Sequence, residues 1–444
     1  MGFSVGMVSL GCPKNQMDAE LMIAKLQAAG IEVRADAATA DAVIINTCGF
    51  IEEAKREAID QILEFSTLKQ EGRIKKIIVT GCMAERYRDE VMAELPECDA
   101  VTGLGANGDI VETVRRVMRD ERVSLFPDKA CWSLEGDRVQ TTPSFFAYLR
   151  IGDGCDNCCT YCAIPQIRGR MRSRPMESVI EEAAWLANHG VRELIVVAQD
   201  TTRYGLDLYG EMRLPELLEQ LCAIEGFRWI RLLYCYPECI TERLLDVMHA
   251  HNGKLSYIDI PVQHASASVL RAMNRTGDRA SLTALMAHIR ERVPGVTLRT
   301  TVMAGFPGET PDDFEELCEF VRQVRFDRLG CFAYSAEEGT VAADMDGQIA
   351  EAEKRRRADL VMELQTSILE SKEEALIGQT VEVLIEAYDR YAESWFGRTA
   401  ADAPDIDCKV FFGGAPDAFR PGDFVSVRVT ERLDIDLIGE VASA

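Results

Sequence analysis

Residues 154–162 read GCDNCCTYC, and this stretch places Cys155, Cys159 and Cys162 at a C-x3-C-x2-C spacing. Three thiolates on one short loop can hold three irons of a four-iron cluster, whereas an ordinary electron-transfer cluster of this type takes four cysteines. The spacing therefore predicts a [4Fe–4S] cluster with one open iron, which can bind a small molecule directly. The loop also directly follows a strand-like run at 145–151, so the predicted cluster should lie at the C-terminal end of that strand.

Six strand-like runs begin with this one, and helical patterns separate most of them, for example at 176–189, 214–224 and 311–324. The six runs are residues 145–151, 193–198, 229–234, 257–262, 297–304 and 329–334. Six βα units are too few for a closed eight-unit barrel, so we expect a partial barrel. In barrels of this kind the chemistry lies at the C-terminal ends of the strands, which is where the cysteine loop is found.

Different folds are expected on the two sides of this core. Up to about residue 140, short apolar runs alternate with helical patterns such as 18–29 and 52–65, which is typical of a parallel sheet with crossover helices. From residue 377, short strands alternate with Gly- and Pro-containing turns, which indicates a small all-β module, a five-stranded barrel. The predicted fold class is α/β, with domains at 1–127, 144–374 and 375–444 and a polar linker at 128–143.

Three further cysteines share a position relative to the predicted strands of the first domain. Cys12, Cys48 and Cys82 each lie one or two residues past a strand-like run, at 5–10, 42–46 and 76–80. Parallel strands of one sheet deliver their C-terminal loops to the same edge, so these cysteines should converge although they are far apart in sequence. We interpret them as a second three-thiolate cluster. The alternative is three buried cysteines that act as small apolar residues.

Composition restricts the cellular compartment and the kinds of partner that can be expected. Fifteen cysteines in 444 residues argue for metal or catalytic thiols rather than a disulfide framework. The formal net charge of −24 argues against a surface built to coat nucleic acid. No apolar run approaches the roughly 18–20 residues that span a bilayer, and the N-terminus lacks the basic start of a secretory signal. We therefore expect a cytoplasmic protein with no membrane contact and no strong binding of nucleic acid.

Several other motifs carry a resemblance to a known family. They lie at 10–15 (LGCPKN), 46–50 (NTCGF), 80–84 (TGCMA), 164–169 (IPQIRG), 197–205 (VAQDTTRYG), 259–264 (DIPVQH) and 305–310 (GFPGET). In this order they resemble the radical S-adenosylmethionine methylthiotransferases over nearly the whole chain. The most similar branch modifies an aspartate of ribosomal protein S12, and residues 198–202 and 402–407 carry that assignment. Cys158 and Cys408 depart from the family pattern.

The resemblance implies a radical reaction that depends on two [4Fe–4S] clusters. The Cys155/Cys159/Cys162 cluster, once reduced, would cleave bound S-adenosylmethionine to a 5′-deoxyadenosyl radical, which removes a hydrogen from the β-carbon of the aspartate. The Cys12/Cys48/Cys82 cluster would present the sulfur, and a second S-adenosylmethionine would supply the methyl group. The core would be a radical SAM barrel and the tail a TRAM-like barrel. An electron donor such as flavodoxin or ferredoxin would be a partner.

The strand-end rule and the resemblance together indicate the residues that hold S-adenosylmethionine. These are Gln199, Asp200, Gln263, Gly305 and Glu309. Each could equally be a structural polar group at a strand end, or, for the glycine, part of a turn. No catalytic side chain beyond the six cluster ligands is indicated.

Two other functions share the same cysteines. A methylthiotransferase that acts on a transfer RNA adenosine would need Lys and Arg to meet phosphates. From residue 375 onward the tail has 13 Asp and Glu against 6 Lys and Arg, which favours a basic protein such as S12 through charge complementarity. A non-catalytic iron–sulfur carrier is disfavoured by the two incomplete cysteine sets and the partial barrel.

Overall fold

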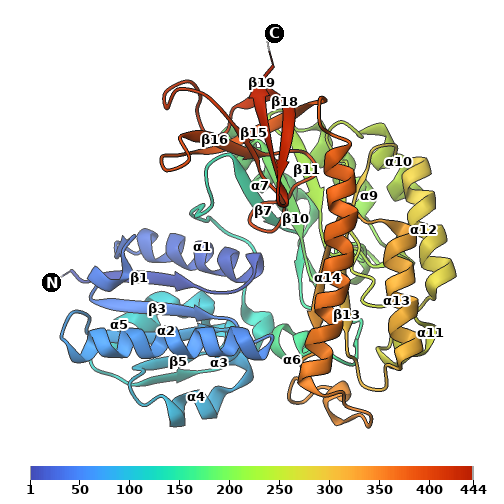
Figure 1. The fold of residues 1–444 in the computed structure, drawn as a ribbon. Coiled ribbons are helices and arrows are strands. Elements are labelled where there is room, and N and C mark those ends of the chain that lie inside the picture. The colour runs from blue at the N-terminus through green and yellow to red at the C-terminus, as the bar shows by residue number, and fades with distance from the viewer. Residues whose placement is uncertain (1, 443–444) are drawn as a thin grey trace.

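The structure, a computed structural model, describes residues 2–442 and has three bodies in chain order (Figure 1). The first is a sheet of six parallel strands within these residues, in the order β2-β1-β3-β4-β5-β6. Its strands are β1 (Ser4–Ser9), β2 (Glu32–Arg34), β3 (Ala42–Thr47), β4 (Lys76–Gly81), β5 (Ala100–Thr102) and β6 (Val123–Leu125). The helices that cover it are α1 (Pro13–Ala28), α2 (Glu52–Gln70), α3 (Cys82–Arg86), α4 (Arg88–Glu94) and α5 (Ile110–Val117).

The second body is an open parallel sheet, with six strands in the described chain, in the order β14-β13-β12-β11-β10-β7. Its strands are β7 (Phe146–Arg150), β10 (Glu193–Val197), β11 (Trp229–Leu232), β12 (Tyr257–Asp259), β13 (Thr297–Ala304) and β14 (Arg328–Ala333). The longer helices between them are α7 (Met176–Asn188), α9 (Leu214–Ala223), α10 (Glu242–Ala250), α12 (Arg279–Arg292) and α13 (Pro311–Val324). Short elements complete it: β8 (Gly152–Asp153), α6 (Ile164–Arg168), β9 (Arg172–Ser173), α8 (Leu206–Tyr209) and α11 (Ala267–Ala272).

The two faces of this core sheet have different partners because successive side chains of a strand point to opposite faces. On the outer face, Leu194 of β10 belongs to a large apolar cluster with Leu217 of α9. On the inner face, Trp229 of β11 belongs to a cluster with Met17 of α1 and Leu384 of the tail. The inner face is therefore covered by the first domain and by the tail, not by the helices of the core itself.

The third body is a closed barrel in the order β15-β16-β17-β19-β18, reached through the long helix α14 (Glu351–Glu374). Its strands are β15 (Thr380–Asp389), β16 (Ser394–Arg398), β17 (Val410–Phe412), β18 (Phe424–Leu433) and β19 (Asp436–Val441). Buried Arg398 pairs with buried Glu193, at the first residue of β10, at 2.6 Å. Tyr257, which begins β12, donates a hydrogen bond to Asp407 at 2.8 Å. The barrel thus covers the N-terminal ends of the core strands, at the end of the molecule away from α6 (Figure 1).

The predicted fold class is confirmed: a parallel-sheet domain, a partial βα barrel and a small β barrel follow one another along the chain. Helix α1 begins at Pro13, earlier than the predicted residue 18, because proline suits the first position of a helix. Strands β2, β5 and β6 were not expected, since each has only 3 residues. The domain limits stay a prediction. Within residues 2–442, no helix combines the length and the apolar character needed to cross a bilayer.

Candidate functional site

The cysteines of the first domain lie at one edge of its sheet. Cys12 precedes α1, Cys48 follows β3 directly, and Cys82 is the first residue of α3, directly after β4. Gly11 has φ +87°, and a Cβ placed on it would lie 2.6 Å from the Cβ of Cys48 and 2.8 Å from its sulfur. Only glycine therefore allows the Cys12 loop to approach Cys48 this closely.

Asn15 ties these three loops together from inside the domain. Its side-chain nitrogen donates to the carbonyl oxygens of Leu10 at 3.0 Å and Thr47 at 2.9 Å, at the ends of β1 and β3. Its side-chain oxygen accepts a hydrogen bond from the Cys82 thiol at 3.3 Å. Burial raises the pKa of the Cys82 thiol to about 12, with a smaller opposing effect of a neighbouring arginine. The Cys82 thiol is thus held neutral until a metal centre displaces its proton.

The cysteines of the central loop lie after β7, at the C-terminal end of the core sheet. Cys155 and Cys159 are buried, and Cys162 is partly buried. Burial raises the pKa of the Cys155 thiol to about 11 and that of the Cys162 thiol to about 12, and the neighbouring thiols add to both shifts. Cys158, between them in sequence, is exposed and has φ +49°. The structure thus separates Cys158 from the three predicted ligands.

Buried donors surround the sulfurs of this loop. The side-chain nitrogen of Asn157 donates to the Cys155 sulfur at 3.4 Å. The Tyr236 hydroxyl lies 3.5 Å from the Cys159 sulfur, and a guanidinium nitrogen of Arg275 lies 3.9 Å from it. Hydrogen bonds to the sulfurs of an iron–sulfur cluster help to set its reduction potential. This thiol-rich, donor-lined loop therefore suits such a cluster.

Neither cysteine set has the geometry of a site for a single ion. Among residues 2–442, no three His, Cys, Asp or Glu side chains gather tightly enough to hold one metal ion. Each cysteine of a four-iron cluster binds a different iron, so its ligands stand farther apart than those of a single zinc ion. All-thiolate donor sets also suit iron–sulfur clusters by their softness. The donor chemistry of the residues present therefore fits the predicted clusters.

Arg168, at the end of α6, reaches from the segment after the central cysteine loop to a cysteine of the first domain. Its guanidinium is fully buried, pairs with Asp153 at 3.1 Å and Asp18 at 2.9 Å, and donates to Asn15 at 2.6 Å. The same group lies 3.6 Å from the Cys82 sulfur. Burial alone would lower the pKa of Arg168, but the two aspartates raise it well above its usual value. A permanent positive charge from the core domain therefore lies against a cysteine of the first domain.

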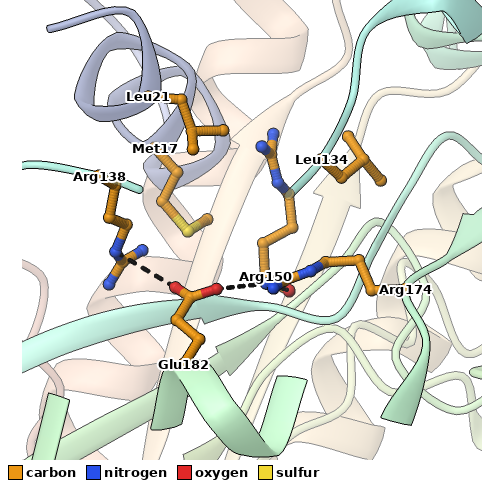
Figure 2. A pocket seen from close by; sticks show the side chains of 7 residues that line it. All are labelled: Met17, Leu21, Leu134, Arg138, Arg150, Arg174 and Glu182. Carbon is orange, nitrogen blue, oxygen red and sulfur yellow. Dashed lines mark hydrogen bonds and ion pairs between the residues drawn. The ribbon is translucent and has the colours of Figure 1, made fainter. Parts of the chain in front are cut away.

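Further charges hold the first domain against the core next to this point. Figure 2 shows a polar cavity of about 10 Å³, room for roughly one water molecule. Its lining residues are Met17, Leu21, Leu134, Arg138, Arg150, Arg174 and Glu182. Linker residue Arg138 pairs with Glu20 of α1 at 3.5 Å and with Glu182 of α7 at 3.2 Å. The linker thus clamps two domains together, and the cavity is too small for a substrate.

The predicted cofactor residues after β10 lie beside the cysteine loop. The side-chain nitrogen of Gln199 donates to Asp153 at 2.8 Å, while its side-chain oxygen is buried without a hydrogen-bond partner in the described chain. Buried Asp200 accepts a hydrogen bond at 2.8 Å from Asn157, the residue that also donates to Cys155. Gln199 therefore offers a free acceptor to a ligand, whereas Asp200 reaches the cysteine loop through Asn157.

The other three predicted residues follow β12 and β13. Gln263 has φ +68°, a conformation that side chains other than glycine rarely adopt. A Cβ on Gly305 would lie 2.5 Å from the side chain of Lys354, so this glycine is needed for packing against α14. The buried carboxylate of Glu309 accepts from the Gly305 amide at 2.8 Å and from Arg357 at 2.6 Å. Its charge is thus satisfied within the chain, and the assignment of these residues to the cofactor stays a prediction.

Several residues of the site were not singled out from sequence. Asn15 and Arg168 lie inside quoted motifs, at 10–15 and 164–169, so the signal was present but gave no role. Arg275 had no signal, because a lone arginine 113 positions after Cys162 shows nothing of its contact with Cys159. Tyr236 likewise follows a strand that was recognised, but its hydroxyl could not be placed.

Comparisons with known proteins give the same three segments. Residues 4–103 match the uncharacterized protein family UPF0004, residues 149–321 the Radical SAM superfamily and residues 377–442 the TRAM domain. Among solved structures, the chain is similar in fold to the radical S-adenosylmethionine methyltransferase TsrM from Kitasatospora setae. The TM-score is 0.58 at 14% identity, over 77% of each chain. The chain is therefore a radical SAM protein whose core domain has one further domain on each side in sequence.

Full-length relatives are far more similar. The chain is 47% identical over 442 residues to the ribosomal protein uS12 methylthiotransferase RimO of Pelotomaculum thermopropionicum, with 99% of each chain covered. It is 46% identical to the protein of the same name from Desulforamulus reducens, again over 99% of both chains. The chain belongs to the family of ribosomal protein uS12 methylthiotransferases.

Proposed function

We propose that this protein inserts sulfur at the β-carbon of an aspartate of ribosomal protein uS12 and methylates it. The observation that carries the proposal is the contact between Cys82 of the first domain and Arg168, which ends the helix that begins two residues after Cys162. A carrier of electrons has no need of two clusters that each lack a protein ligand. When bound, two [4Fe–4S] clusters and S-adenosylmethionine supply the radical chemistry and the sulfur that side chains cannot.

The protein itself holds, orients and shields these groups. Cys12, Cys48 and Cys82 are proposed to ligate one cluster, and Cys155, Cys159 and Cys162 the other. For S-adenosylmethionine, the unpaired oxygen of Gln199 beside the cysteine loop supports a direct contact. Asp200 supports the site by orienting Asn157. For Gln263, Gly305 and Glu309, the support is their place at the same edge of the sheet.

The tail bears on the choice of substrate. With 13 acidic and 6 basic residues from position 375 onward, it is better suited to a basic ribosomal protein than to transfer RNA. We further propose that the protein works in the cytoplasm, where ribosomes are made, and that a small electron-transfer protein such as flavodoxin or ferredoxin reduces it. Strong binding of nucleic acid is not part of this proposal.

Mass spectrometry of uS12 and of transfer RNA from a deletion strain tests the substrate. We expect the methylthio group to disappear from uS12 and to remain on the RNA. Loss from the RNA alone would overturn the choice of substrate in favour of a transfer RNA adenosine. Separately, the anaerobically reconstituted protein should form 5′-deoxyadenosine from S-adenosylmethionine when reduced, and no product would favour a carrier.

An iron count tests the ligand assignment. Replacing Cys12, Cys48 and Cys82 together by alanine should halve the iron bound per chain, and replacing the central three should remove the other half. The matched control replaces Cys98, Cys222 and Cys318, which are also buried but lie away from the site, and should keep all of the iron. Equal iron loss in the control would contradict the assignment.

A further inference from the structure

Lys14 carries its positive charge without an anion, at the tip of a mostly buried side chain. It lies two residues after Cys12, near the start of α1, and its side chain is only 6% exposed. Its ammonium nitrogen lies 3.5 Å from the centre of the Tyr234 ring. Among the residues that the structure describes, no carboxylate forms an ion pair with this nitrogen and no acceptor forms a hydrogen bond with it. Water and one aromatic face are thus the only partners of this ammonium group in the described chain, and an anion that reached it would add a charge-assisted contact.

The aromatic partner is held in an unusual conformation. Tyr234 follows the end of β11 and has φ +60°, where residues other than glycine are rarely found. Its amide donates to Asp259 at 3.2 Å, and its carbonyl oxygen accepts from the Thr201 amide at 3.1 Å. Strained conformations of this kind persist where the surrounding structure imposes them and gather at functional sites. The surrounding hydrogen bonds thus fix the residue on which the Lys14 ammonium lies.

Lys14 and its aromatic partner each have a near neighbour in sequence that contacts one of the two cysteine sets. Its neighbour in sequence, Asn15, accepts the hydrogen bond from Cys82. On the other side, Tyr236 stands two residues after Tyr234, and its hydroxyl is 3.5 Å from the sulfur of Cys159. Lys14 and Tyr234 therefore belong to two segments that carry contacts to different cysteine sets.

The nearby acids already have partners. Asp18 is bound by Arg150 at 2.5 Å and by Arg168, and Asp153 by Arg168 and Gln199. Asp200 is bound by Asn157 and by its own turn. None of these acids pairs with Lys14, so its ammonium group is left available to an anionic ligand.

We propose that the Lys14 ammonium binds the side-chain carboxylate of the aspartate that is modified. The inference rests on the proposed function and names the residue that selects the target. The carboxylate is bonded directly to the β-carbon, so a cation that fixes the carboxylate also fixes the C–H bond to be broken. It also discriminates against asparagine, whose neutral amide cannot replace the missing charge. A second source of the same chemistry is the carboxylate of S-adenosylmethionine, and the test separates the two.

The test measures the affinity of the reconstituted full-length protein for uS12 and for a uS12 variant with asparagine at the modified position. A charge-assisted hydrogen bond predicts that the wild-type protein prefers the aspartate form by about 10- to 100-fold. In Lys14→Met the preference should fall to within about twofold, and Lys14→Arg should keep part of it because the charge remains. The matched control Lys25→Met removes an exposed lysine from the same helix and should keep the full preference. Iron content and circular dichroism report whether each variant has folded.

Three results would overturn the inference. A full preference for aspartate in correctly folded Lys14→Met would do so directly. So would a loss of affinity for S-adenosylmethionine of the same size with the preference intact, because Lys14 would then serve the cofactor. If the wild-type protein neither binds nor modifies uS12, the proposed function itself fails, and this result is distinguishable because it needs no variant.

Discussion

Replacing Arg168 by methionine tests whether this one residue holds the two halves of the site together. Its guanidinium pairs with Asp153 at 3.1 Å and Asp18 at 2.9 Å, all three groups being buried. Removing one partner of a buried ion pair costs about 3–5 kcal/mol because a charge is left without compensation. Asp18 keeps Arg150 at 2.5 Å and Asp153 keeps Gln199 at 2.8 Å, so we expect the lower end, about 3 kcal/mol.

Thermal unfolding of the reconstituted protein measures this loss. For domains of this size, about 1 kcal/mol corresponds to roughly 2–4 °C in Tm, so Arg168→Met should lower Tm by about 6–12 °C. Loosening of the first domain should also expose the linker at 128–143 to proteases earlier than in the wild type. Loss of a positive charge and of a donor 3.6 Å from the Cys82 sulfur should lower the reduction potential of the cluster that we propose at Cys12, Cys48 and Cys82.

Arg170→Met is the matched control. Arg170 lies two residues away and its side chain is 90% exposed; within residues 2–442 it pairs only with Asp156, at 3.2 Å. Surface pairs of this kind contribute little, so Tm, proteolysis and reduction potential should stay at their wild-type values. Equal shifts in the two variants, or no shift in Arg168→Met, would refute the reasoning.

Three other changes have defined outcomes. Burial raises the pKa of Glu373 to about 7. Because the unfolded chain loses this proton at lower pH than the folded chain, the free energy of unfolding should fall by about 3 kcal/mol between pH 4.5 and 7. In Tm scans across pH, Glu373→Gln should remove that fall, whereas Glu374→Gln, at an exposed position, should keep it. Gly305→Ala should cost about 2–4 kcal/mol in denaturant unfolding, from a positive φ and from overlap with α14, whereas Gly308→Ala, also at positive φ but with open space, should cost less than half as much. Arg398→Met should free the C-terminal barrel to proteolysis, because it leaves a buried glutamate of β10 with one partner fewer; a barrel as resistant as in the wild type would count against that role.

The parts of the fold that repeat a regular pattern could be predicted from sequence. The strand-like run 297–304 matches β13 because its residues alternate or run apolar over a full strand length. The convergence of Cys12, Cys48 and Cys82 at one sheet edge followed from a general property of parallel strands. Strands β5 and β6 did not emerge, because 3 residues carry no period.

The contacts between domains could not be predicted. Arg168 and Asp18 are 150 positions apart, and nothing in either local sequence indicates the other. The same holds for Lys14 and Tyr234, since a lysine in an amphipathic helix ordinarily faces solvent. Such pairings depend on how finished domains dock, which is a property of the three-dimensional arrangement alone.

The order of synthesis gives the Arg168 contact a further consequence. Cys82 and Arg168 are separated by 86 residues, and the N-terminal part of a chain leaves the ribosome first. At the usual speed of translation, roughly 5–20 residues per second, Arg168 is synthesised about 4–17 s after Cys82, the last of the three first-domain cysteines. An iron donor that acts on the nascent chain meets an open and uncapped sulfur pocket, whereas one that acts after release meets a pocket already covered by the core. If these cysteines hold a cluster as proposed, translation speed sets a time window for the delivery of metal to this domain.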